Sequence, residues 1–235
     1  MAHMPLQDLL PDRTHGSPGT DIWLGWPLLA GVSLLLLFLT VSVTPVTNND
    51  IWLHMSTGRW ILEHGQVPLT DPFSFSAHGH RYHAHEWLAG VIFEEVHRLF
   101  GIAGLIGLKT GLGGLALLLC AATARRWGAS WSATFGCTWL ALVIVNSRFL
   151  VRPEMFSYVL TALYLAVLAA EHGRLHDPPG SSMAGRQRGA VRFLGSSLLW
   201  YLVPAQWAWT QLHGYFLTGL ALVGLFLAAT WAERL

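Results

Sequence analysis

The chain has 235 residues and a formal net charge of +1, and 53% of its residues are hydrophobic whereas only 11% are charged. Soluble domains are about one quarter charged, so this composition argues against an ordinary soluble protein. The near-neutral balance argues against a nucleic-acid-binding surface. The mean hydropathy of +0.44 instead indicates an integral membrane protein.

The first predicted element is a membrane span over residues 22–46, which contain no charged side chain. About 20 apolar residues cross the hydrocarbon core of a bilayer, so this run is long enough. It is too long for a secretory signal, and no small-residue cleavage site follows it. We expect residues 1–21 to form a cytoplasmic tail and residues 22–235 to form one transmembrane module.

A polar segment follows this span and contains Asp50 and His54, which share one face if the segment is helical. Asp50 fits a general base, and a helix N-cap is the structural alternative. His54 fits a group that orients Asp50 or binds phosphate when protonated, or else an interfacial histidine bonded to water. Residues 54–64 predict a short helix that ends at Gly65 and Pro68.

The chain then predicts a small hairpin around Phe73, Phe75 and Gly79. Alternating histidines on a strand suit zinc, but this spacing matches no known metal motif. We therefore assign no metal ligand, and a divalent metal stays possible as a cofactor. The histidines concerned are His78, His80, His83 and His85. Glu86 begins the next helix beside Trp87, where we expect it to bind substrate in the same cavity as Asp50.

Residues 86–100 predict an amphipathic helix that lies on the membrane surface. Their apolar residues recur at helical spacing, while Glu94, Glu95 and Arg98 supply charge. Five further apolar runs predict spans, so the expected fold is an all-α polytopic transmembrane bundle of about six spans with an extracytoplasmic loop of interfacial helices after the first span. These runs are residues 102–124, 131–146, 155–170, 196–212 and 215–232. Cys120 and Cys137 lie in two of them and are expected to be small buried residues.

The orientation follows from the arginines of the short loops, which favour the cytoplasmic side. Arg125 and Arg126, together with the loop of residues 171–193, should be cytoplasmic. The loop of residues 47–101 then faces outward, as do residues 148–154 and His213.

The remaining candidate residues are cations and one acid near the predicted outer ends of spans. Lys109 lies within a span, where it would hold a lipid phosphate or extend to the interface. Arg148 and Arg152 suit phosphate through fork-like hydrogen bonds, and ion pairing with Glu154 is the alternative. His213 would point into the same outer vestibule, or belong to a plain interhelical turn.

Several short motifs occur together in one order along the chain. They are Asp50-x-Trp52-x-His54, Gly58, Gly65-x-Val67-Pro68-x-x-Asp71-Pro72-Phe73-Ser74, Glu86-Trp87-Leu88, Leu99-Phe100-Gly101, Arg152-Pro153-Glu154 and Trp209-x-x-x-His213-Gly214. This series resembles bacterial polytopic proteins of the glycosyltransferase C superfamily, and is similar to relatives of protein O-mannosyltransferases and lipid A aminoarabinose transferases. Such proteins usually have more spans, so the chain looks like their N-terminal part.

The resemblance implies an outward-facing transferase that uses a polyprenyl-phosphate sugar. The family's acid after the first span corresponds to Asp50, and its second acid to Glu154, where many relatives have Asp. The family's basic residue after Phe-Gly corresponds to Lys109, where relatives commonly have Arg.

The function expected from the sequence is therefore transfer of a sugar from a polyprenyl-phosphate donor to an extracytoplasmic acceptor in a bacterial inner membrane. Its partners would be the bilayer, the lipid-linked sugar and an unidentified acceptor, with no nucleic acid. A transporter or lipid flippase is one alternative, and a non-catalytic scaffold subunit is another. A transporter needs a polar path through the membrane, whereas Lys109 is the only charged residue of the predicted spans.

Overall fold

A computed structural model of the chain describes residues 20–176 and 198–233. Within these residues the regular structure is helical, without strands, which confirms the predicted all-α class. The α-helices of this part are α1 (Thr20–Ser42), α2 (Asp50–His64), α3 (Trp87–Arg126), α4 (Trp131–Val145), α5 (Glu154–His176), α7 (Leu202–Leu212) and α8 (Phe216–Ala232). The predicted tail of residues 1–21 and the predicted loop of residues 171–193 lie largely outside the described residues.

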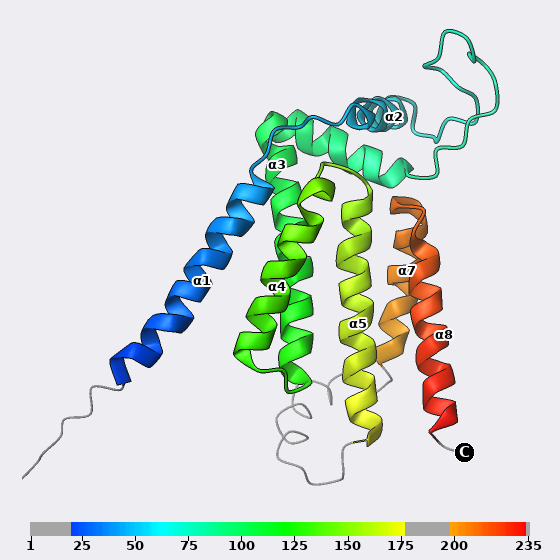
Figure 1. Ribbon diagram of the computed structural model, residues 1–235. Helices are drawn as coiled ribbons and strands as arrows, with labels where there is room; N and C mark the ends of the chain where they lie inside the picture. Colours follow the sequence, from blue (N-terminus) through cyan, green and yellow to red (C-terminus); the bar gives the residue numbers. More distant parts are fainter. Residues whose placement is uncertain (1–19, 177–197, 234–235) are drawn as a thin grey trace, which may run out of the picture.

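A break at Gly101 divides α3 into two differently directed parts. Gly101 has φ 63° and ψ −157°, a conformation that glycine tolerates because it has no Cβ. The part before the break lies across the ends of the neighbouring helices, whereas the part after it stands alongside α4 and α5 (Figure 1). This arrangement agrees with a surface helix over residues 86–100, and its placement on a membrane stays a prediction.

The polar segments gather at one end of the bundle, called here the upper end because it carries α2 at the top of Figure 1. The connection from α4 to α5 and the turn from α7 to α8 lie at this end, whereas the connection from α3 to α4 lies at the other. The segments expected on one membrane face, 47–101, 148–154 and His213, are therefore at the same end. Which side of a membrane they face stays a prediction.

Two described helices are long and apolar enough to cross a membrane, Trp87–Arg126 and Glu154–Leu175. Pro27–Ser42 and Phe216–Ala232 are shorter apolar helices. The helices in two predicted spans fall short of the roughly 20 residues required, since α4 has 15 residues and α7 has 11. Six spans therefore stay a prediction.

The upper end is held together by a close crossing of α2 and α3. Ile51 and Met55 of α2 are buried against Ala89 and Phe93 of α3 in one apolar cluster. Apolar burial contributes roughly 25 cal/mol per Å², so this cluster fixes α2 across the bundle. Gly58 of α2 and Gly90 of α3 let the two backbones touch at this crossing.

One smaller expectation holds in part and another is wrong. The segment before α3 turns back on itself through an antiparallel bridge between Thr70 and Arg81, as a small hairpin requires, but without regular strands. Cys120 and Cys137 are exposed on helix surfaces, not buried. A helix that is apolar all round has no polar face to mark its outer side. Its sequence therefore does not show which of its residues face outward.

Candidate functional site

Asp50 is the first residue of α2 and does not cap it. Asn49 occupies the N-cap position, and the Asp50 N–H donates to Oδ1 of Asn48 at 3.1 Å. The Asp50 carboxylate instead accepts a hydrogen bond from Nη2 of Arg152, with 3.1 Å between Nη2 and Oδ2. The alternative in which Asp50 caps α2 is therefore wrong. Its carboxylate makes an electrostatic contact and does not bond the helix backbone.

Arg152 brings the turn before α5 against the start of α2. Its Nη2 also donates to Oδ1 of Asn48 at 3.2 Å, so one nitrogen contacts both side chains. Its Nε is buried and has no hydrogen-bond partner among the described residues. A buried N–H without a hydrogen-bond partner is energetically unfavourable. An anion bound to the guanidinium would give this N–H an acceptor. Arg148, in the short helix Asn146–Arg148, is exposed.

Glu154, the first residue of α5, is buried, with 8% of its surface exposed. Its Oε1 has no hydrogen-bond partner among the described residues, while the Tyr158 hydroxyl interacts with the carboxylate. The alternative of an ion pair between Glu154 and Arg152 does not hold, because Arg152 pairs with Asp50. Glu154 is thus a buried acid without a close cationic partner in the described chain.

Glu86 is the N-cap residue of α3, and its carboxylate faces imidazoles from different segments. Its Oε1 lies 3.4 Å from Nε2 of His213 and 3.7 Å from Nε2 of His85. Its Oε2 lies 3.6 Å from Nε2 of His54. These separations exceed an ordinary hydrogen bond, but catalytic contacts often tighten only when substrate is bound.

Burial raises the pKa of Glu86 above its usual value, because a charged carboxylate loses hydration there. His85 and the Gly214 N–H lower the pKa of Glu86, whereas the neighbouring Glu154 raises it further. The side chain of Glu86 is 15% exposed, so solvent reaches one part of it. A half-buried carboxyl with a raised pKa is better suited to hold and release a proton than a fully solvated one.

The contacts of His213, at the end of α7, indicate which of its ring nitrogens carries the proton. The Tyr215 N–H can only donate, and it lies 3.4 Å from Nδ1 of His213. Ser157 Oγ lies 2.8 Å from the same nitrogen, and it accepts from Nε1 of buried Trp209 at 2.7 Å. The serine proton is therefore free to reach Nδ1, and the imidazole proton is assigned to Nε2, which faces Glu86.

Burial lowers the pKa of His213 to about 4, with further lowering from His85 and His54. The imidazole is therefore neutral at neutral pH. Protonating Nδ1 would also oppose the Tyr215 N–H and force the Ser157 hydroxyl to turn. The hydrogen bonds at Nδ1 and the burial of the ring thus both oppose protonation of His213.

His54 joins the two halves of the site. It shares α2 with Asp50 and faces Glu86 across the crossing with α3. Burial lowers the pKa of His54, the Asp50 carboxylate raises it, and His85 and Arg152 lower it further. The structure thus brings together, around His54, several residues that the sequence singled out. They are Asp50, Glu86, Arg152 and His213.

Lys109 lies apart from these contacts, with 1% of its surface exposed. Its Nζ donates to Oγ1 of Thr44 at 2.8 Å and to the Thr44 carbonyl at 3.3 Å, and lies 5.8 Å from the ring centroid of Phe149. The side chain does not extend to the interface as the alternative required. It connects the end of α1 to α3.

No group of three metal-binding side chains among the described residues is arranged to hold a metal ion. Sequence reasoning missed Asn48, Ser157 and Tyr158, which bond to the residues it selected. Ser157 and Tyr158 gave no signal because they lie inside an apolar run, where a hydroxyl commonly bonds its own helix.

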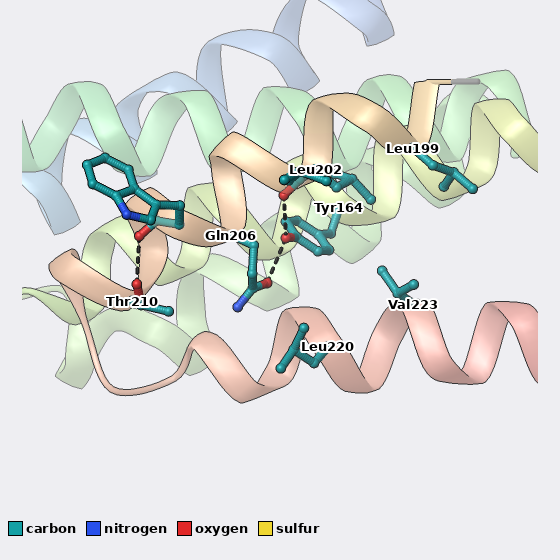
Figure 2. Close-up of a pocket in the computed structure, with 9 residues that line it drawn as sticks. Tyr164, Leu199, Leu202, Gln206, Thr210, Leu220 and Val223 are labelled. Atoms are coloured by element: carbon teal, nitrogen blue, oxygen red, sulfur yellow. Dashed lines mark hydrogen bonds between the residues drawn. The ribbon is translucent and has the colours of Figure 1, made fainter. Parts of the chain in front are cut away.

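A second feature is an apolar cavity of about 510 Å³ on α7 and α8 (Figure 2). Its polar groups already bond one another: the Tyr164 hydroxyl reaches Oε1 of Gln206 at 2.7 Å, and Nε2 of Gln206 reaches the Phe216 carbonyl at 2.9 Å. Thr210 bonds the Trp207 carbonyl at 2.7 Å. The cavity therefore offers apolar surface and no reactive group.

Comparisons with known proteins give no information on the geometry of the upper end. No family model matches the chain, and no curated protein or solved structure is significantly similar to it. The likeness to the glycosyltransferase C superfamily therefore rests on the motifs of the sequence, and the assignment of an activity rests on the contacts around Asp50, Glu86 and Arg152.

Proposed function

We propose that the protein is a membrane glycosyltransferase that moves a sugar from a polyprenyl-phosphate donor to an acceptor outside the cytoplasm, in a bacterial inner membrane. Asp50 is the general base in this proposal. The observation that carries it is the pair between Asp50 and Arg152, at 3.1 Å, in which a carboxylate and a phosphate-binding group meet at the end of apolar helices.

A bilayer setting is supported by how little of the long apolar helices is buried. In the apolar 18-residue stretch of each helix, only 17% is buried inside the protein for Trp87–Arg126 and 39% for Glu154–Leu175. The core helix of a soluble protein would be mostly buried, and a signal sequence would lie near the N-terminus. Large exposed side chains such as Leu118, Ile144 and Leu225, each at least 67% exposed, suit contact with lipid.

Arg152 is the proposed phosphate-binding residue. Its unpartnered Nε and the Nη2 now bonded to Asp50 together make the fork that matches two phosphate oxygens. A donor phosphate would take Arg152 from Asp50 and leave a negative charge beside the carboxylate. Donor binding would thereby release the Asp50 carboxylate to accept a hydrogen bond from the acceptor hydroxyl. Exposed Arg148 is a second phosphate contact in the same turn.

The proposed step conserves atoms and charge. The acceptor hydroxyl oxygen attacks the anomeric carbon of the sugar, and its proton passes to the Asp50 carboxylate. The bond from the anomeric carbon to the phosphate oxygen breaks, and its electron pair leaves with the polyprenyl phosphate. Lys109 has no part in this step, because its ammonium is occupied by Thr44.

A transporter or flippase is disfavoured by the charge distribution. Translocation of a charged headgroup needs polar groups through the membrane centre. Lys109 is the only charged residue of the predicted spans, and it bonds Thr44 in a buried contact. A scaffold subunit has no need for an unpartnered buried Nε on Arg152 or an unpartnered Oε1 on Glu154.

The test is transfer of labelled sugar from a bacterial polyprenyl-phosphate lipid extract by the full chain in nanodiscs. Asp50→Asn keeps the side-chain shape but cannot accept the proton, so the rate should fall about 10²–10⁴-fold. Glu63→Gln is the matched control, because Glu63 is an exposed acid on the same helix. Normal turnover by Asp50→Asn, with wild-type active, would remove Asp50 from the mechanism.

A further inference from the structure

We propose that Glu86 is the acid partner of Asp50: it carries a proton on Oε2, facing His54, and gives this proton to the departing phosphate. The phosphate step rests on the proposed function, whereas the proton on Glu86 rests on the geometry of its neighbours.

The two oxygens of Glu86 face different partners. Oε1 lies 3.4 Å from Nε2 of His213, and that nitrogen carries the imidazole proton because Nδ1 accepts from Tyr215 and Ser157. Oε1 is thus the accepting oxygen. A proton held by the carboxyl must then sit on Oε2, whose facing group is Nε2 of His54 at 3.6 Å.

No arginine or lysine among the described residues pairs with Glu86. Arg59 is bonded to Glu94 at 2.7 Å and Arg152 to Asp50 at 3.1 Å, so the cations of the neighbouring segments are engaged. Glu154 adds a second acid nearby, with a buried Oε1 that has no partner. Two adjacent acids without a cation favour protonation of one of them.

Every titratable group facing Glu86 allows this assignment. They are His54 on α2, His85 beside it in sequence, Glu154 on α5 and His213 at the end of α7. Burial lowers the pKa of both His54 and His213, so neither supplies a fixed positive charge at neutral pH. Asp50, in contrast, is 63% exposed and bonded to a guanidinium. Two carboxyls in such different environments are suited to opposite proton-transfer roles.

The proton balance closes over one reaction cycle. As the phosphate leaves, the proton on Oε2 of Glu86 passes to the phosphate oxygen that receives the electron pair. Asp50 meanwhile gains the proton of the acceptor hydroxyl. Asp50, which is 63% exposed, then loses this proton to water, and Glu86, which is 15% exposed, regains one from water, so the starting state is restored.

The first experiment follows the carboxyl groups directly, by pH-difference infrared spectroscopy of the full chain in nanodiscs without substrate. We expect a carboxylic-acid carbonyl band at neutral pH that disappears under alkaline conditions. Glu86→Gln should abolish this band. Glu95→Gln should leave it unchanged, because Glu95 lies on the same helix but bonds Arg98 at 2.7 Å. Wild-type protein without the band, or a band that survives in Glu86→Gln, overturns the inference.

The second experiment is the pH profile of sugar transfer. In wild-type protein the rate should fall on the alkaline side, where Glu86 loses its proton. Glu86→Gln should lower the rate constant about 10²–10⁴-fold and remove the alkaline fall, and Glu86→Asp should restore part of both. An alkaline fall that persists in Glu86→Gln overturns the acid role.

The two experiments separate the inference from the proposed function. An infrared band assigned to Glu86, with no transfer by wild-type protein from any polyprenyl-phosphate sugar, upholds the proton on Glu86 and removes the transferase. Transfer by wild-type protein that lacks the band upholds the transferase and overturns the inference.

Discussion

Gly58→Ala should separate α2 from α3 and destabilise the protein. A Cβ at Gly58 would lie 2.2 Å from the Gly90 carbonyl oxygen and 2.8 Å from the Val91 nitrogen. These are backbone atoms of α3, so no side chain can rotate away and one helix must move. The contact is reciprocal, because a Cβ at Gly90 would lie 2.5 Å from the His54 carbonyl oxygen.

Two effects of opposite sign decide the magnitude. Alanine gains about 1 kcal/mol over glycine in helix propensity. Overpacking of a tight contact costs about 1–3 kcal/mol, and more where backbone must shift. We expect the steric effect to exceed the propensity gain, with a net loss of about 1–2 kcal/mol and a fall in Tm of about 2–8 °C.

The assay is thermal unfolding in detergent, followed by circular dichroism, with Gly107→Ala as the control. Gly107 is also in α3 but has no atom within 4 Å of its Cβ position, so propensity alone should act there. The double variant Gly58→Ala with Gly90→Ala should cost less than the sum of the single variants, because either one already separates the helices. A Tm for Gly58→Ala at or above that of wild type would refute the close crossing.

Three further predictions concern stability. Lys109→Gln, which keeps a donor for Thr44, should retain about 1 kcal/mol more unfolding free energy than Lys109→Met; equal values would remove this bond. Tyr164→Phe should lose about 0.5–1.5 kcal/mol, since its hydroxyl bonds the Leu202 carbonyl, and an unchanged denaturation midpoint would argue against it. Between pH 6.5, the usual pKa of histidine, and about pH 4, His213 stays neutral in the folded protein but gains a proton in the unfolded chain. Stability should therefore fall as pH drops through this window, by up to about 3 kcal/mol, and His213→Gln should reduce the slope measured by denaturation.

Much of the upper end could be predicted from the sequence because charged residues make up only 11% of the chain and fall mostly between the apolar runs. Asp50, Glu86, Arg152 and His213 follow or precede apolar runs, so alternation of the runs places them at one end. The helix that ends at Gly65 was also predictable, since glycine takes up the left-handed conformation that closes α2.

The pairings were not predictable, because they join residues far apart in the chain. For Arg152 the expectation was phosphate binding, with an ion pair to nearby Glu154 as the alternative, but the structure pairs it with Asp50 of another helix. Local spacing gives no information on such a contact. The run of residues 131–146 matches α4 to within one residue, whereas α7 begins only at Leu202, after a short 3₁₀ helix, because hydrophobicity does not distinguish a 3₁₀ turn from an α-helix.

The apolar crossing of α2 with α3 links the stability of the protein to the geometry of the site. Met55 and Phe93 pack this crossing, and the ring of Phe93 also lies edge-on to His54, with 6.5 Å between the ring centroids. Shortening either side chain would lower stability by about 2–5 kcal/mol and shift His54 relative to Glu86. The separation of Nε2 of His54 from Oε2 of Glu86 already exceeds hydrogen-bond length, at 3.6 Å. A small rotation of α2 therefore changes how closely these two groups approach, and the apolar crossing controls the alignment of the site.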